Sequence, residues 1–129
     1  MTSNYNISEI EEAVIEIVRS LNVSKKVYPN RPKSSESSAD FVVVSVGDGV
    51  DDMSAYGECN IDIDLFAKDI DHIKNSKKLS VMYEKLVGGF PASSGRLLFS
   101  TEWNVLGDTP DDYGYHARII RIKTIVKAY

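Results

Sequence analysis

Apolar residues near the start of the chain recur at the spacing of a helix. Between residues 7 and 21 most lie three or four positions apart, and glutamates occupy other positions of the helical wheel. This period predicts an amphipathic helix. Ser8 followed by Glu11 predicts a capping box at its first turn, and residues 1–6 are expected to form a flexible arm. The apolar stripe consists of Ile7, Ile10, Val14, Ile17, Val18 and Leu21.

Five later segments have the composition or the alternation of β-strands. Residues 40–46 are rich in β-branched side chains. Residues 55–68 alternate, with an apolar side that includes Ile61 and Ile63 and a polar side that includes Asp62. A period of two is typical of a strand with one buried face and one wet face. The expected strands are 27–28, 40–46, 55–68, 96–106 and 115–127.

Glycine, proline and serine mark the connections between these strands. Pro29 ends the first short strand, because proline fixes φ and donates no backbone hydrogen bond. Residues 29–39 are therefore expected to be a mobile loop. The Gly-Asp-Gly of residues 47–49 predicts a turn, and residues 107–114 (GDTPDDYG) predict a second mobile loop.

A second amphipathic helix is expected to start between Asp69 and Ser76. It would end at Gly88 and Gly89, since glycine accepts the left-handed conformation that closes a helix. The order of elements is then helix, short strand, strand, strand, helix, strand, strand. This order predicts one α+β domain over residues 1–129, with a mostly antiparallel sheet of four to five strands and two helices packed on one face. The buried stripe of the second helix would be Leu79, Met82, Tyr83 and Leu86.

Composition fits a globular protein in a reducing compartment. The chain has 129 residues, of which 43% are hydrophobic and 26% charged, as in an ordinary single domain. Cys59 is the single cysteine, so no internal disulfide can form. The longest notable aliphatic run, residues 41–44, is far shorter than the roughly 20 residues of a membrane span, and the glutamates of residues 7–21 exclude a secretory signal. No membrane partner is expected.

Charge is distributed unevenly along the chain. The formal net charge is −4, which argues against general nucleic-acid binding because such binding needs a basic surface. Residues 48–71 hold eight acids and one base, whereas the chain from residue 115 onward holds four Lys or Arg residues and no acid. Two hypotheses follow. The two segments neutralise each other, within one molecule or between copies, or they form two separate solvated faces.

Reactive residues are few and do not form a known motif. Asp62 and Asp64 lie on one side of a strand, as do carboxylates that hold Mg²⁺ in some nucleases. No third carboxylate stands at a motif spacing, so an acidic wet face explains the pair equally. Cys59, His72 and His116 do not form a spaced zinc-ligand set. The sequence predicts a protein that is not an enzyme and has no cofactor or metal. A small Mg²⁺-dependent nuclease using the two aspartates is the alternative.

Two isoleucines predict that part of the sheet surface is covered. Ile119 and Ile125 share the polar side of the last strand with Arg121 and Lys123. Apolar side chains in such a position suggest contact with a neighbouring subunit. Trp103 lies in the hydrophobic register of its strand, which favours a core position over an interface position. The candidate interface between copies consists of Asp62, Asp64, Ile119, Arg121, Lys123 and Ile125.

The arrangement of these segments resembles the small tail-terminator, or tail-completion, proteins of phages. The likeness covers nearly the whole chain and is one of pattern and length. It is carried by the proline-bearing segment 28–32 (YPNRP) after the first helix, the long alternating strand that runs into a helix, and the closing hairpin. The last two read YGECNIDIDLFAKD before NSKKLSVMYEKLVGG, and RLLFSTEWNVLG before GYHARIIRIKTIVKAY.

The resemblance implies a structural role with no catalytic residues. Such a subunit forms a ring, commonly a hexamer, that caps the tail tube and joins it to the head or neck. Its partners would be copies of itself, tail-tube proteins and head-connector proteins. It would be cytoplasmic during assembly and then part of the virion. The acidic segment 48–71 departs from the family pattern, and an adaptor for another cytosolic protein is a further alternative.

Overall fold

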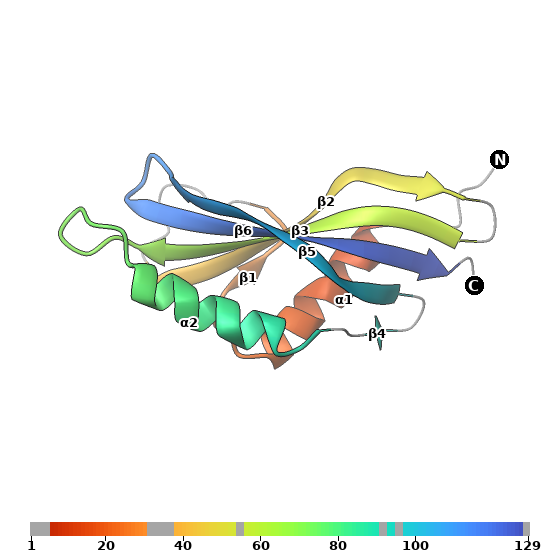
Figure 1. Cartoon of the computed structure of the whole chain (residues 1–129), viewed down its shortest axis with the longest axis horizontal. Helices are drawn as coiled ribbons and strands as arrows, with labels where there is room; N and C mark the ends of the chain where they lie inside the picture. Colours follow the sequence, from red (N-terminus) through yellow and green to blue (C-terminus); the bar gives the residue numbers. More distant parts are fainter. Residues whose placement is uncertain (1–5, 31–37, 54–55, 91–92, 95–96, 128–129) are drawn as a thin grey trace.

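The computed structural model describes residues 6–30, 38–53, 56–90, 93–94 and 97–127. Within them the chain forms two helices and one sheet of six strands (Figure 1). The predicted α+β class is confirmed. The helices are α1 (Ile7–Ser20) and α2 (Ser76–Val87). The strands are β1 (Val27–Tyr28), β2 (Asp40–Asp52), β3 (Tyr56–Lys68), β4 (Ser93–Ser94), β5 (Leu97–Pro110) and β6 (Tyr115–Lys127).

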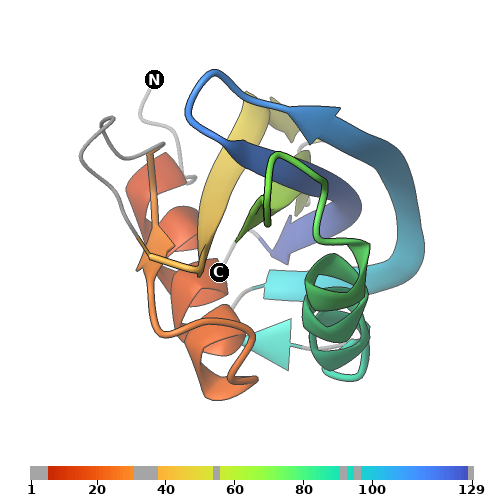
Figure 2. The ribbon, with the colours of Figure 1, turned by 90° about the vertical axis from the view of Figure 1, so that its left-hand side faces the viewer.

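The sheet is mixed rather than wholly antiparallel. Its strand order is β1-β2-β3-β6-β5-β4, and β1 pairs with β2 in parallel while the other neighbours are antiparallel. The predicted count of four to five strands was too low. The strand that was missed is β4 at the edge of the sheet, and its two residues are too few to show the alternation that predicts a strand. Viewed along the strands, β5 curves round one side of the molecule (Figure 2).

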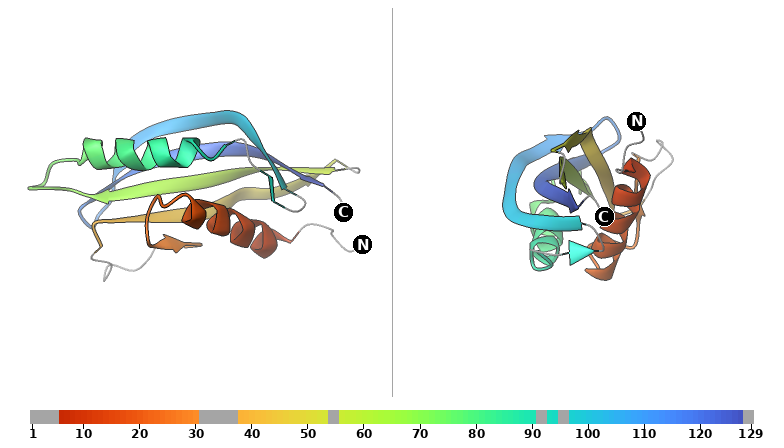
Figure 3. Two further views of the ribbon diagram at one scale, coloured as in Figure 1. Left: turned by 90° about the horizontal axis from the view of Figure 1, so that it is seen from below. Right: turned by 90° about the vertical axis from the view of Figure 1, so that its right-hand side faces the viewer.

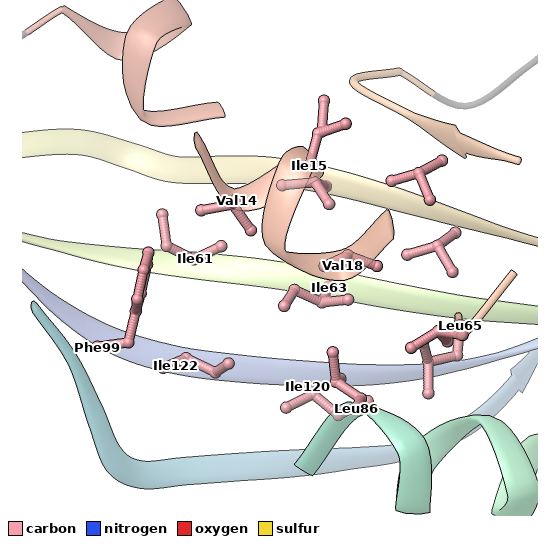
Figure 4. Packing of buried hydrophobic residues seen from close by; sticks show 14 of the residues in the cluster. Val14, Ile15, Val18, Ile61, Ile63, Leu65, Leu86, Phe99, Ile120 and Ile122 are labelled. Carbon is pink, nitrogen blue, oxygen red and sulfur yellow. The ribbon is translucent and has the colours of Figure 1, made fainter. Parts of the chain in front are cut away.

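Both helices pack on the same face of this sheet (Figure 3). Val14 and Val18 of α1 and Leu86 of α2 join one buried cluster with the apolar side of β3 and β6 (Figure 4). Each such aliphatic side chain contributes about 1.5–3 kcal/mol when it is fully buried. The strand members of the cluster include Val42, Val44, Ile61, Ile63, Leu65, Ile120 and Ile122.

Two strands continue through glycines at positions where the sequence predicted a turn or a loop. β2 extends to Asp52, and the register between β2 and β3 shifts between Gly47 and Asp51, near Gly49 at φ +79°. β5 extends to Pro110, with Gly107 at φ +88° inside a second register shift. An extra residue at a bulge lets a strand bend and continue. The turn at 47–49 was therefore wrong, and of the loop expected at 107–114 only residues 111–114 lie outside a strand.

The helix ends also differ from the prediction. The N-cap of α1 is Asn6, whose side-chain oxygen accepts hydrogen bonds from the backbone of Ser8 and Glu9 at 3.0 and 3.4 Å. The capping box with Ser8 as its cap was wrong. Gly88 at the end of α2 is right-handed, with φ −63°. The arm at residues 1–5 and most of the loop at 29–39 fall outside the described residues, and neither described helix is both long and apolar enough to cross a bilayer.

Candidate interaction face

The sheet has an open face, which we define as the side opposite the helices. Residues paired directly across antiparallel strands point to the same side of a sheet. Asp62 of β3 is paired with Arg121 of β6, and Asp64 with Ile119. The strand register thus brings all six residues of the predicted interface onto the open face. Together with their neighbours these residues are Glu58, Asn60, Asp62, Asp64, Leu98, Asn104, Ile119, Arg121, Lys123 and Ile125.

Charges on the open face are paired within the molecule. The Arg121 guanidinium donates two hydrogen bonds to Asp62, with Nε–Oδ1 at 2.8 Å and Nη2–Oδ2 at 3.2 Å. Lys123 Nζ lies 3.9 Å from Glu58 Oε1. Two-point contacts of this kind are the strongest class of ion pair at a partly exposed site. Of the two hypotheses for the charge segregation, neutralisation inside one molecule accounts for these residues, because β3 and β6 run side by side in opposite directions.

Asp64 is the exception on this face. Its cross-strand neighbours are the apolar Val43 on β2 and Ile119 on β6. Its Oδ1 atom is buried without a hydrogen-bond partner, the one such side-chain atom among the described residues. Burial raises the pKa of the Asp64 carboxyl to about 6, the charge of Asp62 adds to this effect, and Arg121 partly opposes it. A group with this pKa exists in both protonation states near neutral pH.

The two aspartates do not form the cation site that the nuclease alternative requires. Both carboxylate oxygens of Asp62 accept hydrogen bonds from Arg121, so a positive charge already occupies the position that a metal ion would take. Among the described residues no group of three or more His, Cys, Asp or Glu side chains is placed to hold a metal ion. Magnesium needs several oxygen ligands in octahedral geometry. The geometry therefore does not favour metal-dependent phosphate chemistry at this pair.

Cys59 does not act together with His116. The thiol is buried on the helix side of β3, and burial raises its pKa to about 11, so it stays protonated at neutral pH. A protonated thiol is a poor nucleophile. Along β3 the partner of His116 is Ala67, eight residues from Cys59, which corresponds to about 26 Å of strand. His116 Nδ1 instead lies 2.7 Å from Asp69 Oδ1.

Comparisons with known proteins do not supply a family. No protein-family model and no curated protein matches the chain. The resemblance to phage tail-terminator proteins therefore stays a prediction.

One end of the open face is closed by an aromatic cluster that the sequence pattern did not reveal. Phe41 stacks on Phe66 with ring centroids 4.4 Å apart and meets Tyr115 edge-on at 5.2 Å. The Tyr115 hydroxyl donates a hydrogen bond to the Ser38 carbonyl at 2.7 Å. In the sequence, Phe66 lies on the polar side of the alternating segment 55–68, and an aromatic residue at that position was the available sign of this cluster. The cluster covers one end of the face, and Ile119 and Ile125 lie farther along it, only partly buried.

A second feature went unnoticed in the sequence because its residues are far apart in the chain. The C-terminal end of α1, the segment that follows it and α2 surround an open pocket of about 660 Å³, which we call the basic pocket. Among the described residues that line it are five basic side chains and one acidic one, Asp40. The basic residues are Arg19, Lys25, Lys26, Lys78 and Lys85.

Proposed function

We propose that this protein is a structural subunit that assembles with copies of itself into a ring at the end of a phage or prophage tail. In this role it terminates the tail tube and joins it to the head or neck. Its partners are tail-tube and head-connector proteins. It is cytoplasmic during assembly and part of the virion afterwards. The open face is the surface that supports the self-association.

The observation that carries the proposal is the mixed character of the open face. Its basic side chains Arg121 and Lys123 are already paired with Asp62 and Glu58 on the neighbouring strand. Ile119 and Ile125 lie on either side of Arg121 and Lys123 along β6, and the Leu98 side chain opposite Ile125 is 39% exposed. When a partner covers a surface of paired charges and apolar side chains, few polar groups lose hydrogen bonds to water without replacement. The centre of a protein interface has this character. A face that only meets solvent has no need of these isoleucines.

Exchange of Ile125 for aspartate tests the open face as a contact between copies. A new charge there would be buried without a partner, beside Glu58 and opposite Leu98. We expect the wild-type protein to form oligomers in a light-scattering concentration series, and the Ile125→Asp variant to need a higher concentration to do so. Ile73→Asp is the matched control, since Ile73 is an exposed apolar residue between β3 and α2, outside both the open face and the basic pocket.

The structural role needs its own readout. Negative-stain electron microscopy of the wild-type protein with a tail-tube protein should show rings at the tube ends, and fewer with Ile125→Asp. Circular dichroism must show that the variant is folded. A wild-type protein that stays monomeric at high concentration and adds nothing to tube ends would contradict the proposal and favour a monomeric adaptor.

A further inference from the structure

Two lysines of the basic pocket, Lys25 and Lys85, have no carboxylate partner among the described residues. Asp40 is held by Lys78, with Nζ 2.8 Å from Oδ2, and by a hydrogen bond from the Ser24 hydroxyl. Arg19 reaches Glu16 at 3.8 Å, whereas Lys25 and Lys85 border the open volume, and no second carboxylate is found among the described residues that line it. Lys85 Nζ donates a weak hydrogen bond to the Asn22 carbonyl at 3.5 Å, which leaves its charge uncompensated. Converging cations of this kind favour a ligand that carries several negative charges.

Helix α1 presents a surface of the opposite sign. Its acidic face, which we define as Glu9, Glu12 and Glu16, is exposed and lies on the side of the helix opposite the buried Val14 and Val18. Within the described residues neither Glu9 nor Glu12 has an ion-pair partner, and Glu16 reaches only the exposed Arg19, at 3.8 Å. Glu9 and Glu12 therefore balance no basic side chain in the described part of the molecule.

The two surfaces have matching dimensions. Glu9 and Glu16 are seven residues apart on α1, and Lys78 and Lys85 are seven residues apart on α2. Seven residues make two helical turns, or about 10 Å, so the backbone positions that carry these side chains stand at equal intervals along the two helices. Lys78 is already paired with Asp40, which leaves Lys25 and Lys85 as the receiving lysines. Arg19 and Asn22 place the end of α1 at the pocket rim, whereas the acidic face looks away from the sheet.

We propose that the acidic face of α1 in one copy of the protein docks into the basic pocket of the next copy. The inference rests on the proposed ring function and names a second contact between copies, in addition to that of the open face. The docking surface and the receiving surface are different, so each subunit can make both contacts. Head-to-tail contacts of this kind form a ring when the rotation between neighbouring subunits closes. The open face lies on the other side of the sheet and stays free for its own contact.

A nucleic acid is the other polyanion that a basic pocket can bind. The whole chain carries a net charge of −4, and the acidic face lies on the same helix whose end borders the pocket. These charges repel a phosphate backbone, which needs an extended basic surface. A second copy brings only a short row of carboxylates, so it meets less of this repulsion than a nucleic acid does.

Charge exchange between the two surfaces tests the contact. The first variant, Glu9→Lys with Glu12→Lys, gives α1 a basic face, and the second, Lys25→Glu with Lys85→Glu, makes the pocket more acidic. By sedimentation velocity each variant alone should assemble at about tenfold higher concentration than wild type, because like charges now meet. An equimolar mixture of the two variants should recover assembly, since basic helices then meet acidic pockets. Wild-type assembly should weaken as salt rises.

Matched controls carry the same changes of charge at other exposed positions. Glu84→Lys with Asp112→Lys and Lys68→Glu with Lys77→Glu lie outside the pocket lining and outside the acidic face. They should leave the assembly concentration unchanged, and all variants should keep the wild-type circular dichroism spectrum.

The possible failures are distinguishable. If wild type forms rings and both charge-exchange variants do so equally well, the docking proposal is overturned while the ring function stands. A monomeric wild type overturns both. If wild type binds a fluorescent single-stranded DNA in an anisotropy titration, and the pocket variant loses that binding, the pocket serves nucleic acid and the docking proposal is again overturned. Recovery in the mixture, with unchanged controls, supports it.

Discussion

Replacement of Asp64 by asparagine should stabilise the fold at neutral pH. The pKa of Asp64 rises from 3.8 to about 6 in the folded protein, mainly because the carboxyl is buried. Above about pH 6 the folded chain therefore holds a charge that the unfolded chain holds at lower cost. The full difference between the two pKa values corresponds to about 3 kcal/mol, and partial exposure of the side chain reduces it to about 2 kcal/mol. Asparagine has nearly the same shape as aspartate and stays neutral, so the substitution removes the charge and keeps the packing.

The pH dependence gives this prediction its sign. Asp64 is protonated in both states well below pH 3.8 and ionised in both well above pH 6. Between these values the folded state binds the extra proton, so the contribution of this group to stability falls as pH rises through the window. The advantage of the Asp64→Asn variant should be about 2 kcal/mol near pH 7.5 and below about 0.5 kcal/mol near pH 4.

Urea unfolding followed by the fluorescence of Trp103, the single tryptophan, measures the difference. All samples need one protein concentration, because self-assembly would add to the apparent stability. Asp62→Asn is the matched control and should change stability in the opposite direction, by about 1 kcal/mol, since Arg121 then loses its ion pair. If Asp64→Asn is no more stable than wild type near pH 7.5, or if its advantage does not shrink toward pH 4, the reasoning from burial is refuted.

Two further predictions concern the core. Gly89→Ala should lower the free energy of unfolding by about 1 kcal/mol in a urea titration, because its Cβ would stand 2.5 Å from the terminal carbons of Leu21. Gly88→Ala should be neutral or stabilising, since its φ of −63° suits alanine, and an equal loss for both variants would contradict this account. Cys59 should react with a thiol reagent only as fast as the protein unfolds, because its thiol is buried with a pKa of about 11. Rapid reaction of the native protein at pH 7 would contradict it.

Local periodicity determined most of the secondary structure from the sequence. The 3.6-residue period of residues 7–21 and the two-residue period of residues 55–68 each depend on which side of an element meets the core, and neighbouring residues record this directly. Even so, the predicted ends of elements were wrong where the conformation of a single residue sets the end. The cap at Asn6 and the glycines at 49 and 107 depend on backbone conformation, which hydrophobic pattern does not specify.

The candidate site was predicted in part. Alternation placed Asp62 and Asp64 on one side of β3, and Ile119 and Arg121 on one side of β6, before any pairing was known. Only the pairing of β3 with β6 in one register joined the two sets and set Asp62 against Arg121. A register shifted by two residues would keep every face and change every ion pair, so the sequence left internal and intermolecular neutralisation equally open.

The sequence by itself determined the class of fold, which side of each main element faces the core, and the absence of a spaced catalytic motif. These follow from residues close together in the chain. The tertiary structure alone decided which acid meets which base, that Asp64 Oδ1 is buried without a hydrogen-bond partner, and that Lys25 and Lys85 line one pocket. These facts depend on distances between segments that are far apart in the chain, and such distances are set by packing and strand register rather than by local pattern.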